Sequence, residues 1–322
     1  MKVFLVVGEA SGDRLGASLM QGIKKLTKKV EFKGIFGPEM EIDGLKSLFE
    51  MSELSVMGVT EILPKYFKLR RRLSQTVEAV LEYKPDLLIT IDSPEFCLRV
   101  AKKVRAANLN IRTIHYVAPT VWAWRPKRAK KMAHFIDHVL ALFPFEPPYM
   151  EAEGMDCDFV GHPIAAMGPI APKKISSFQK KYKIDPVQPS LVILPGSRLS
   201  EVQRLLPIFC NVLRRNEFSN FQLIFPTLPH LREYIANVIS DLPHKTYVIT
   251  GQNLTAEEAT QQRFVAFSSA QVALAASGTV SLELASVGTP MVIAYDMSWL
   301  SRWVINTMLR IDTVSLVNLI SK

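Results

Sequence analysis

Short apolar runs rich in valine, isoleucine and leucine alternate with longer amphipathic stretches along the whole chain. Buried parallel strands have this composition, and the stretches between the runs are long enough for the helices that connect such strands. The pattern predicts an α/β fold of doubly wound parallel sheets. Strands are expected over residues 3–7, 85–92, 111–117, 137–143, 190–196, 221–226, 246–251, 271–277 and 290–295. Helices are expected over residues 13–27, 69–83, 95–107, 200–215 and 279–287.

The length of 322 residues is enough for two domains of ordinary size, each with its own core. The stretch 161–189 is dense in glycine and proline, and a new apolar run begins directly after it. We therefore predict two domains, residues 1–166 and residues 167–322. The alternative is one long doubly wound domain with a surface excursion at this stretch.

Charge and composition restrict the partners of the chain. The net charge of +9 favours an anionic partner, which is a nucleic acid, a phospholipid surface or a phosphorylated substrate. The first apolar run is too short for a signal peptide, and no run approaches the roughly 18 residues of a membrane-spanning helix. We therefore expect a cytoplasmic protein. Its three cysteines are widely spaced and support neither a disulfide framework nor a zinc site.

Two predicted strand-to-helix turns in the second half carry groups that suit an anion. One turn is PGSR, residues 195–198, and the other is SGT, which is Ser277, Gly278 and Thr279. Ligands of parallel sheets bind outside the carboxyl ends of the strands, so we expect both turns to face one crevice. Helix amides and hydroxyls on one side and the Arg198 guanidinium on the other would hold a diphosphate.

Glu283 follows Thr279 by one helical turn, which suits a carboxylate that accepts hydrogen bonds from both ribose hydroxyls of a nucleotide. Ser200 and Gln203 have capping-box spacing at the start of the other helix. Neither a P-loop nor a GxGxxG sequence follows a predicted strand, which disfavours nucleotide hydrolysis and hydride transfer. The alternative is ordinary structure: caps at Ser277 and Thr279, an ion pair between Arg198 and Glu201, and a solvated Glu283.

The first half has polar residues at two strand ends. The run GEASGD, with Glu9, Ser11 and Asp13, follows the first strand and suits an anion or a sugar, although helix capping by Ser11 or Asp13 explains it equally. Asp92 ends a later strand, where partial burial makes a carboxylate a better general base. Helix capping is again the alternative. If Asp92 is not the base, we name Glu9, Asp13 and His115 as substitutes.

The segment HYVAPTVWAWRPKRAKKM, residues 115–132, combines aromatic residues with a basic run. Such a segment binds a sugar and its phosphates or stacks on single-stranded nucleic acid. The alternative is that the tryptophans pack beneath the helix and the cations form a solvated face. His115 is expected to be a hydrogen-bonded core or loop histidine, because no second histidine lies at metal-ligand spacing.

The segment ILPKYFKLRRRL, residues 62–73, mixes apolar residues with five cations. A helix of this composition lies in a membrane interface with its cations toward lipid phosphates. We predict a membrane-facing surface here, and a core helix is the alternative. The residues assigned to that surface are Leu63, Tyr66, Phe67, Leu69, Arg70 and Arg71.

Several of these runs, together and in order, closely resemble the lipid-A-disaccharide synthase family. The matching runs are GEASGD, VMGVTEILP, IDSPEF, HYVAPTVWAWRPKR, LFPFEPPYM, FVGHP, LPGSRLSEVQRLLP, SGTVSLELASVGTPMVIAY and SLVNLI. They extend over essentially the whole chain, and the VWAWRPKR and PFEPP runs are highly specific.

The resemblance implies an inverting glycosyltransferase of the GT-B fold, with two Rossmann-like domains that face a cleft and with no metal or other cofactor. Its substrates would be UDP-2,3-diacylglucosamine and 2,3-diacylglucosamine 1-phosphate, and its product the β-1′,6-linked lipid A disaccharide 1-phosphate. Carried over by position, Asp92 is the base on the acceptor hydroxyl, and the 277–279 turn faces UDP. Arg198, Glu283 and Asn318 are further positions of importance.

The resemblance also implies an enzyme that lies peripherally on the inner membrane and binds no nucleic acid. The family continues past NLISK through further helices, so we expect these C-terminal helices to be missing and a homodimer to be weakened. Two rival functions are another GT-B-type enzyme, such as a muramyl-type N-acetylglucosaminyltransferase or a UDP-sugar 2-epimerase, and a non-enzymatic nucleic-acid or membrane binder.

Overall fold

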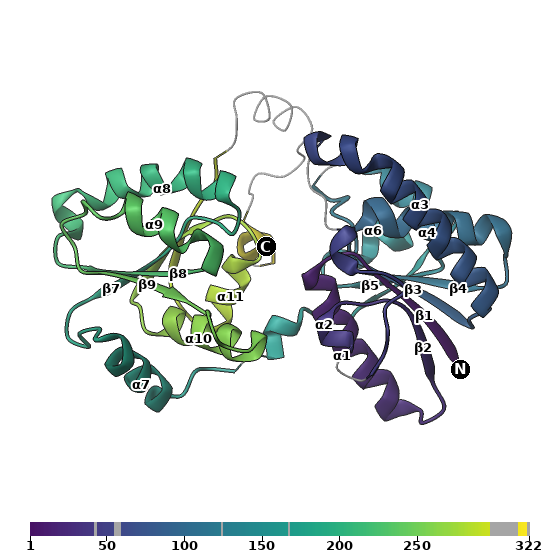
Figure 1. Ribbon diagram of the computed structural model, residues 1–322, viewed down its shortest axis with the longest axis horizontal. Coiled ribbons are helices and arrows are strands. Elements are labelled where there is room, and N and C mark those ends of the chain that lie inside the picture. Colours follow the sequence, from purple (N-terminus) through teal and green to yellow (C-terminus); the bar gives the residue numbers. More distant parts are fainter. Residues whose placement is uncertain (42–43, 55–58, 124, 167, 297–314, 321–322) are drawn as a thin grey trace. The chain divides into compact units, whose positions relative to one another are not determined.

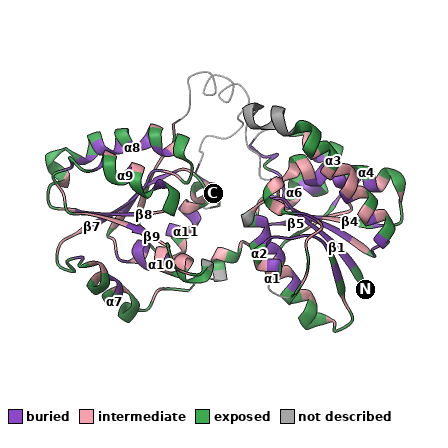
Figure 2. Cartoon of the chain, viewed as in Figure 1, coloured by how far each residue is buried: buried purple, intermediate pink, exposed green. Residues whose placement is uncertain are grey.

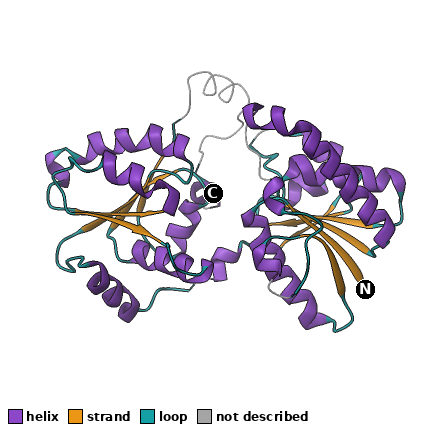
Figure 3. Ribbon diagram, in the orientation of Figure 1, coloured by secondary structure: helices purple, strands orange, loops and turns teal. Residues whose placement is uncertain are grey.

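The computed structural model describes residues 1–41, 44–54, 59–123, 125–166, 168–296 and 315–320, and leaves the side chains of residues 10, 59–65, 166 and 256 undescribed. The chain divides into two compact units, Met1–His162 and Pro163–Lys322. This division falls a few residues before the boundary that we predicted. Each unit has its own parallel sheet with helices, and each is described by itself (Figures 1 and 3).

The sheet of the first unit has the strand order β2-β1-β3-β4-β5-β6, and every neighbouring pair is parallel. Its strands are β1 (Lys2–Val7), β2 (Glu31–Ile35), β3 (Leu87–Ile91), β4 (Arg112–Tyr116), β5 (His138–Ala141) and β6 (Asp156–Phe159). Its helices are α1 (Ala10–Leu26), α2 (Pro38–Glu41), the 3₁₀ turn η1 (Met51–Glu53), α3 (Val59–Tyr83), α4 (Pro94–Ala107), α5 (Lys127–Met132) and α6 (Pro147–Glu151).

The sheet of the second unit has the strand order β11-β10-β7-β8-β9 and is also parallel. Its strands are β7 (Ser190–Leu194), β8 (Gln222–Thr227), β9 (Thr246–Thr250), β10 (Val272–Ala276) and β11 (Met291–Ala294). Its helices and turns are η2 (Pro163–Ala166), α7 (Pro172–Tyr182), α8 (Leu199–Leu213), η3 (Asn216–Phe218), η4 (Pro229–Leu231), α9 (Arg232–Val238), α10 (Ala256–Ser268), α11 (Val280–Ser286) and α13 (Leu316–Ile320).

All nine predicted strands are present within about two residues of their expected limits. The two strands that the sequence did not reveal are β2 and β6, which lie at the two edges of the first sheet. An edge strand is partly solvated and needs no continuous apolar run. Accordingly, β2 alternates buried and exposed residues along most of its length, and β6 has the polar sequence DCDF with no fully buried residue.

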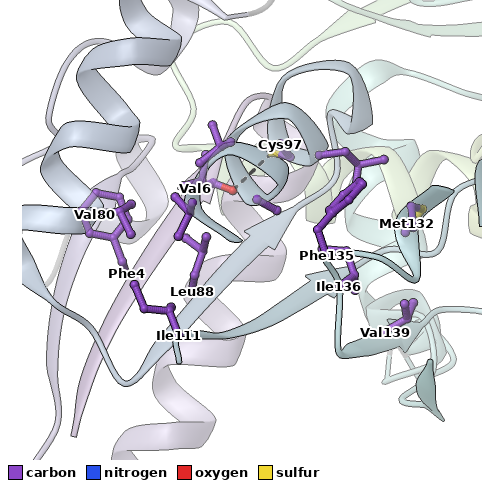
Figure 4. Packing of buried hydrophobic residues seen from close by; sticks show 14 of the residues in the cluster. Phe4, Val6, Val80, Leu88, Cys97, Ile111, Met132, Phe135, Ile136 and Val139 are labelled. Carbon is purple, nitrogen blue, oxygen red and sulfur yellow. Dashed lines mark hydrogen bonds between the residues drawn. The ribbon is translucent and has the colours of Figure 1, made fainter. Parts of the chain in front are cut away.

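Strand and helix residues together form the core of each unit. Figure 2 shows the buried residues concentrated along the strands and on the inner faces of the helices. In the first unit, Phe4 and Val6 of β1 pack with Leu88 of β3 and Val80 of α3 (Figure 4). The Cys97 thiol is fully buried and points to the carbonyl oxygen of Val6 (Figure 4). Burial raises the pKa of this thiol, so Cys97 is a core residue and not a nucleophile.

The strand order creates one topological switch point in each sheet. In the first unit the chain runs from β1 outward to β2 and then returns to the other side of β1 as β3. In the second unit it runs from β7 through β8 to β9 and returns beside β7 as β10. Doubly wound sheets bind ligands outside the carboxyl ends of the strands at such a point. The segments that follow β1, β3, β7 and β10 are therefore the places to look for a site.

Candidate active site

Two of the predicted polar residues after β1 and β3, Ser11 and Asp92, meet at the switch point of the first unit. The Ser11 hydroxyl donates a hydrogen bond of 3.0 Å to Oδ2 of Asp92. Oδ1 of Asp92 accepts a bond of 2.8 Å from the amide of Ser93. A Cβ atom on Gly8 would lie 2.5 Å from the Ser93 hydroxyl oxygen, so glycine at this position lets the two turns approach each other. The carboxylate of Asp92 is half-buried and oriented by two donors.

The backbone at these strand ends is strained. Asp92 and Ser93 have φ angles of 55° and 41°, and Val117, which follows β4, has a φ of 81°. Left-handed conformations are unfavourable for residues with a side chain, most of all for a β-branched one. Strain of this kind persists where the surrounding structure fixes it, and it collects at functional sites. Here it gathers at the carboxyl ends of two adjacent strands, which supports the assignment of the site.

Asp13, which we predicted to contact substrate, is instead a buried structural residue. Its side chain is 1% exposed. Its two oxygens accept hydrogen bonds from the amides of Gly37, Glu39 and Met40, at 3.0, 2.8 and 3.2 Å. The carboxylate thus caps the start of α2 from a neighbouring helix. Both predicted roles of Asp13, a contact with substrate and a cap of its own helix, therefore differ from what its contacts show.

The other residues near the base differ in how well they could replace it. Glu9 is half-buried and directly precedes α1. His115 is fully buried in β4, where Nδ1 lies 2.8 Å from the Thr90 hydroxyl, and burial lowers its pKa to about 4. The prediction of a core histidine is confirmed. Because Asp13 and His115 are both buried, Glu9 is the substitute base that retains solvent contact.

Trp122 of the tryptophan segment is packed into the first unit. Trp122 is 8% exposed, and its indole nitrogen donates to Glu146 at 3.3 Å. The other carboxylate oxygen of Glu146 accepts hydrogen bonds from the amides of Leu142 and Phe143, both at 3.0 Å. The alternative that a tryptophan packs beneath the helix is therefore correct for Trp122. Trp124 lies outside the described residues.

Glu146 should make stability depend on pH. Burial raises its pKa to about 7, although its N–H donors act in the opposite direction. The folded state therefore binds more protons than the unfolded state between pH 4.5 and 7, and the free energy of unfolding decreases as the pH rises through this window, by up to about 3 kcal/mol. We expect urea unfolding at pH 5 and pH 8 to show this loss in the wild type and not in Glu146→Gln. Parallel curves for the two proteins would contradict this expectation.

The turn after β7 differs in detail from the prediction. Helix α8 begins at Leu199 with Arg198 as its N-cap, so the residue that closes the cap is Glu201 and not Gln203. Oε2 of Glu201 accepts the amides of Ser197 and Arg198, and Oε1 pairs with the Arg198 guanidinium at 3.0 Å. Gly196 has a φ of 135°, and a Cβ there would lie 2.8 Å from Oε2. The ion pair that we named as the alternative for Arg198 is therefore present, and the same Glu201 carboxylate occupies the amides that would suit an anion.

The turn after β10 leads into α11, which carries Glu283. Gly278 has a φ of 157°, and Thr279 is the N-cap residue without a side-chain cap bond. Glu283 is not solvated: its side chain is 12% exposed and pairs with Arg263 of α10 at 2.7 Å. Asn318 is exposed on α13, which packs against α11. Apart from Arg198, the predicted residues of this unit therefore lie in the turn after β10, on α11 and on α13 beside it.

The predicted membrane segment belongs to one long helix, α3. Phe67 is 80% exposed and Tyr66 is 49% exposed, and their rings make an edge contact. Arg70 and Arg71 are also exposed. Leu69 instead packs against the core of the first unit, so its assignment to the outer surface was wrong. The side chain of Leu63 lies outside the described residues.

Arg72 of the same helix anchors α3 and is not part of the outer surface. Its guanidinium makes two bonds of 2.7 Å to Glu53 of η1. This pairing holds the pKa of Glu53 at about 2. Among the described residues no helix is long and apolar enough to cross a membrane. The same part of the chain contains no group of three or more histidine, cysteine or acidic side chains placed to hold a metal.

A family model for lipid-A-disaccharide synthetase matches residues 3–322. The chain belongs to the lipid-A-disaccharide synthetase family. The family and the enzyme class that the sequence motifs predicted, a disaccharide-forming glycosyltransferase of lipid A synthesis, are thereby confirmed. Lipid-A-disaccharide synthase of Ruegeria pomeroyi is 51% identical, over 100% of this chain and 80% of that protein. The synthase of Rhodospirillum centenum is 43% identical, over 98% of this chain and 78% of that protein.

Solved structures of other enzymes resemble this member of the synthetase family in fold. UDP-GlcNAc 2-epimerase from Neisseria meningitidis bound to UDP-GlcNAc has a TM-score of 0.62 at 15% identity, over 100% of this chain and 90% of that chain. Sucrose-phosphate synthase from Thermosynechococcus elongatus has a TM-score of 0.57 at 12% identity, over 91% and 81%. Together with the two parallel sheets, these likenesses confirm the predicted GT-B class of two Rossmann-like units.

Proposed function

We propose that this chain moves 2,3-diacylglucosamine from UDP to the 6-hydroxyl of 2,3-diacylglucosamine 1-phosphate, with inversion at the anomeric carbon. The products are the β-1′,6-linked disaccharide 1-phosphate and UDP. One observation supports this proposal above the others: in a chain of this family, the carboxylate of Asp92 lies at the switch point of the first sheet and is oriented by Ser11. The first unit then binds the acceptor, and the second unit binds the donor.

Asp92 acts as the general base in this reaction. A carboxylate has about four lone-pair sites, and the described contacts of Asp92 use one site on each oxygen. The remaining sites are available to accept the proton of the acceptor hydroxyl as its oxygen attacks the anomeric carbon. The two existing donors keep the carboxylate in position. Ser11 is a positioning residue in this scheme, because it acts through Asp92.

The leaving UDP is stabilised by the turn after β7. The amides of Ser197 and Arg198 and the Arg198 guanidinium now share the carboxylate of Glu201. A diphosphate carries more charge than a carboxylate and forms the same charge-assisted bonds, so it competes with Glu201 for these donors. Glu283 accepts hydrogen bonds from the ribose hydroxyls, while Arg263 donates a hydrogen bond to one of its oxygens. Two further parts of the donor site are Asn318, which the family resemblance marks as important, and the turn formed by Ser277, Gly278 and Thr279.

Product analysis tests the proposed reaction. The protein is incubated with UDP-2,3-diacylglucosamine and 2,3-diacylglucosamine 1-phosphate, and the lipid fraction is examined by mass spectrometry. We expect the disaccharide 1-phosphate to form together with one equivalent of UDP. Folded protein that yields no disaccharide contradicts the proposal. A 2-epimer of the UDP-sugar without disaccharide would assign the chain to epimerase chemistry instead.

Arg198 should contribute strongly to UDP affinity. A hydrogen bond to a charged group is worth about 1.5–3 kcal/mol, so Arg198→Ala should raise the Kd for UDP by roughly 10- to 100-fold. Calorimetric titration measures the change. Arg214→Ala is the matched control, because Arg214 is the C-cap of the same helix and pairs with Asp241 at 2.7 Å. Equal UDP affinity of the two variants would remove Arg198 from the donor site.

We also propose that the exposed surface of α3 lies on the inner membrane, because acylated substrates reside there. Exposed aromatic rings beside Arg70 and Arg71 suit an anionic lipid surface. Burying a large apolar side chain contributes about 1.5–3 kcal/mol, so the double change Tyr66→Ser and Phe67→Ser should weaken binding to phosphatidylglycerol vesicles at least 10-fold. Sedimentation measures the bound fraction. Leu109→Ser, at a residue 74% exposed, is the control, and equal losses would contradict the proposal.

A further inference from the structure

Three arginine side chains gather around one carboxylate beside the proposed base. Glu95 of α4 accepts a hydrogen bond from Arg128 of α5, and its Oε1 also lies 3.5 Å from the Arg125 guanidinium. Its other oxygen lies 3.6 Å from the guanidinium of Arg99. We call Arg99, Arg125 and Arg128 the arginine cluster. With three cations around one anion, these four side chains together form a cationic group.

The fold restricts two members of the arginine cluster, Arg128 and Arg125. The Arg128 side chain is 19% exposed, so packing limits the positions that its guanidinium can take. Arg125 has a φ of 51° although it precedes Pro126, a position at which helical conformations are disfavoured. The backbone is therefore strained where it directs Arg125 toward Glu95. The side chains of Arg125, Arg99 and Glu95 are 50–64% exposed, so the packing of Arg128 and the strained backbone of Arg125 are what distinguish the cluster from a wholly solvated basic face.

The cluster lies close to Asp92 along the chain and in the sheet. Glu95 is three residues after Asp92, and three residues span at most about 11 Å. The amide of Asp92 donates to the carbonyl of Tyr116, whose strand leads into the segment that carries Arg125 and Arg128. Two short connections therefore fix the cluster beside the carboxylate. The limit of about 11 Å between the backbones of Asp92 and Glu95 is of the order of one sugar ring with substituents on opposite sides.

We propose that the arginine cluster is the subsite for the 1-phosphate of the acceptor sugar, while Asp92 accepts the proton of the 6-hydroxyl. This inference rests on the proposed function and adds the recognition of the acceptor to it. Guanidinium groups bind phosphate through two parallel hydrogen bonds, which fixes orientation as well as affinity. Glu95 keeps the guanidinium groups together, and a phosphate with its higher charge takes over their outer donors. The subsite would select a phosphorylated acceptor over the same sugar without phosphate.

Kinetics with two acceptors tests the subsite. Initial rates are measured for Arg125→Ala and Arg128→Ala with 2,3-diacylglucosamine 1-phosphate and with the same sugar lacking the phosphate. We expect each variant to raise KM for the phosphorylated acceptor by roughly 10- to 100-fold. The KM for the UDP-sugar and all constants for the unphosphorylated acceptor should stay within about 3-fold of wild type, because charge-assisted contacts are lost only with the phosphate.

Arg112→Ala is the matched control. Arg112 begins β4 and pairs with Asp156 at 3.5 Å, so it is an exposed arginine at the opposite end of the same strand. Its removal should change none of these constants, because exposed ion pairs contribute little stability. Equal losses for both acceptors in the cluster variants would show a structural role and overturn the inference. Arg125→Lys, which keeps the charge on a half-exposed side chain, should recover part of the affinity.

A binding measurement separates this inference from the proposed reaction. Glucosamine 1-phosphate is titrated into the wild-type protein and into Arg125→Ala at low salt, and the heat of binding is recorded. Binding to the wild type that weakens at least 10-fold in the variant supports the subsite even if no disaccharide forms in the product assay. Equal binding to both proteins, or no binding to either, overturns the subsite and leaves the proposed reaction to its own test.

Discussion

Asp92→Asn should fold as the wild type does and lose about a thousandfold in kcat, since a positioned general base contributes typically 10²–10⁴-fold. Asparagine has nearly the same shape, and its carbonyl oxygen can still accept one of the bonds that Ser11 and Ser93 donate. It cannot accept a proton from an alcohol. The change therefore removes the chemistry and keeps the local structure. Initial-rate kinetics and thermal unfolding, measured on the same preparation, separate these two effects.

The control for this experiment lies directly before β3, the strand that Asp92 follows. Asp86 directly precedes β3 and accepts a bond of 2.7 Å from the amide of Lys2, at the amino end of the sheet. Asp86→Asn should leave the rate unchanged, because ligands of parallel sheets bind at the opposite end. If Asp92→Asn were nearly as active as Asp86→Asn, the base would have to be another group. Glu9 would then be the first to test, because Asp13 and His115 are buried.

The sequence predicted the strands of this chain well because a central parallel strand is buried on both faces. Burial on both faces requires a continuous apolar run, which is visible without a structure. Edge strands do not have this requirement, so β2 and β6 could not be found in this way. The positions of Asp92 and of the turns after β7 and β10 follow from the strand ends alone. They could therefore be placed correctly before the fold was known.

The partners of the site residues could not be predicted, because they depend on the order of strands and not on the strands themselves. Ser11 reaches Asp92 only because β1 and β3 are neighbours, although the two residues are 81 positions apart. Arg263 reaches Glu283 from a different helix. The capping partner of α8 was missed for a local reason. Two pairs with capping-box spacing overlap there, Arg198 with Glu201 and Ser200 with Gln203, and it is the side chain of Glu201 that accepts hydrogen bonds from the amides.

Asp13→Ala should lower the free energy of unfolding by about 2–6 kcal/mol, because it leaves buried N–H donors without an acceptor. The change leaves the amides of Gly37, Glu39 and Met40 without their acceptor, and two of these three bonds are buried. Each unsatisfied buried donor costs about 1–3 kcal/mol. Asp13→Asn keeps one acceptor oxygen and should lose less. Urea unfolding with linear extrapolation measures all three proteins.

The same variant decides between the two roles that Asp13 has been given. A substrate contact at the surface would leave the unfolding curve unchanged and raise a KM, whereas a buried cap shifts the curve and alters kinetics only as the fold is lost. Asp86→Ala is the comparison, because that exposed carboxylate caps a single amide, and its loss should cost about 1 kcal/mol or less. If Asp13→Ala were as stable as Asp86→Ala, the prediction that Asp13 contacts substrate would be supported. The structure favours the opposite result, because a carboxylate that is 1% exposed and already accepts three amides cannot reach a ligand without unfolding the start of α2.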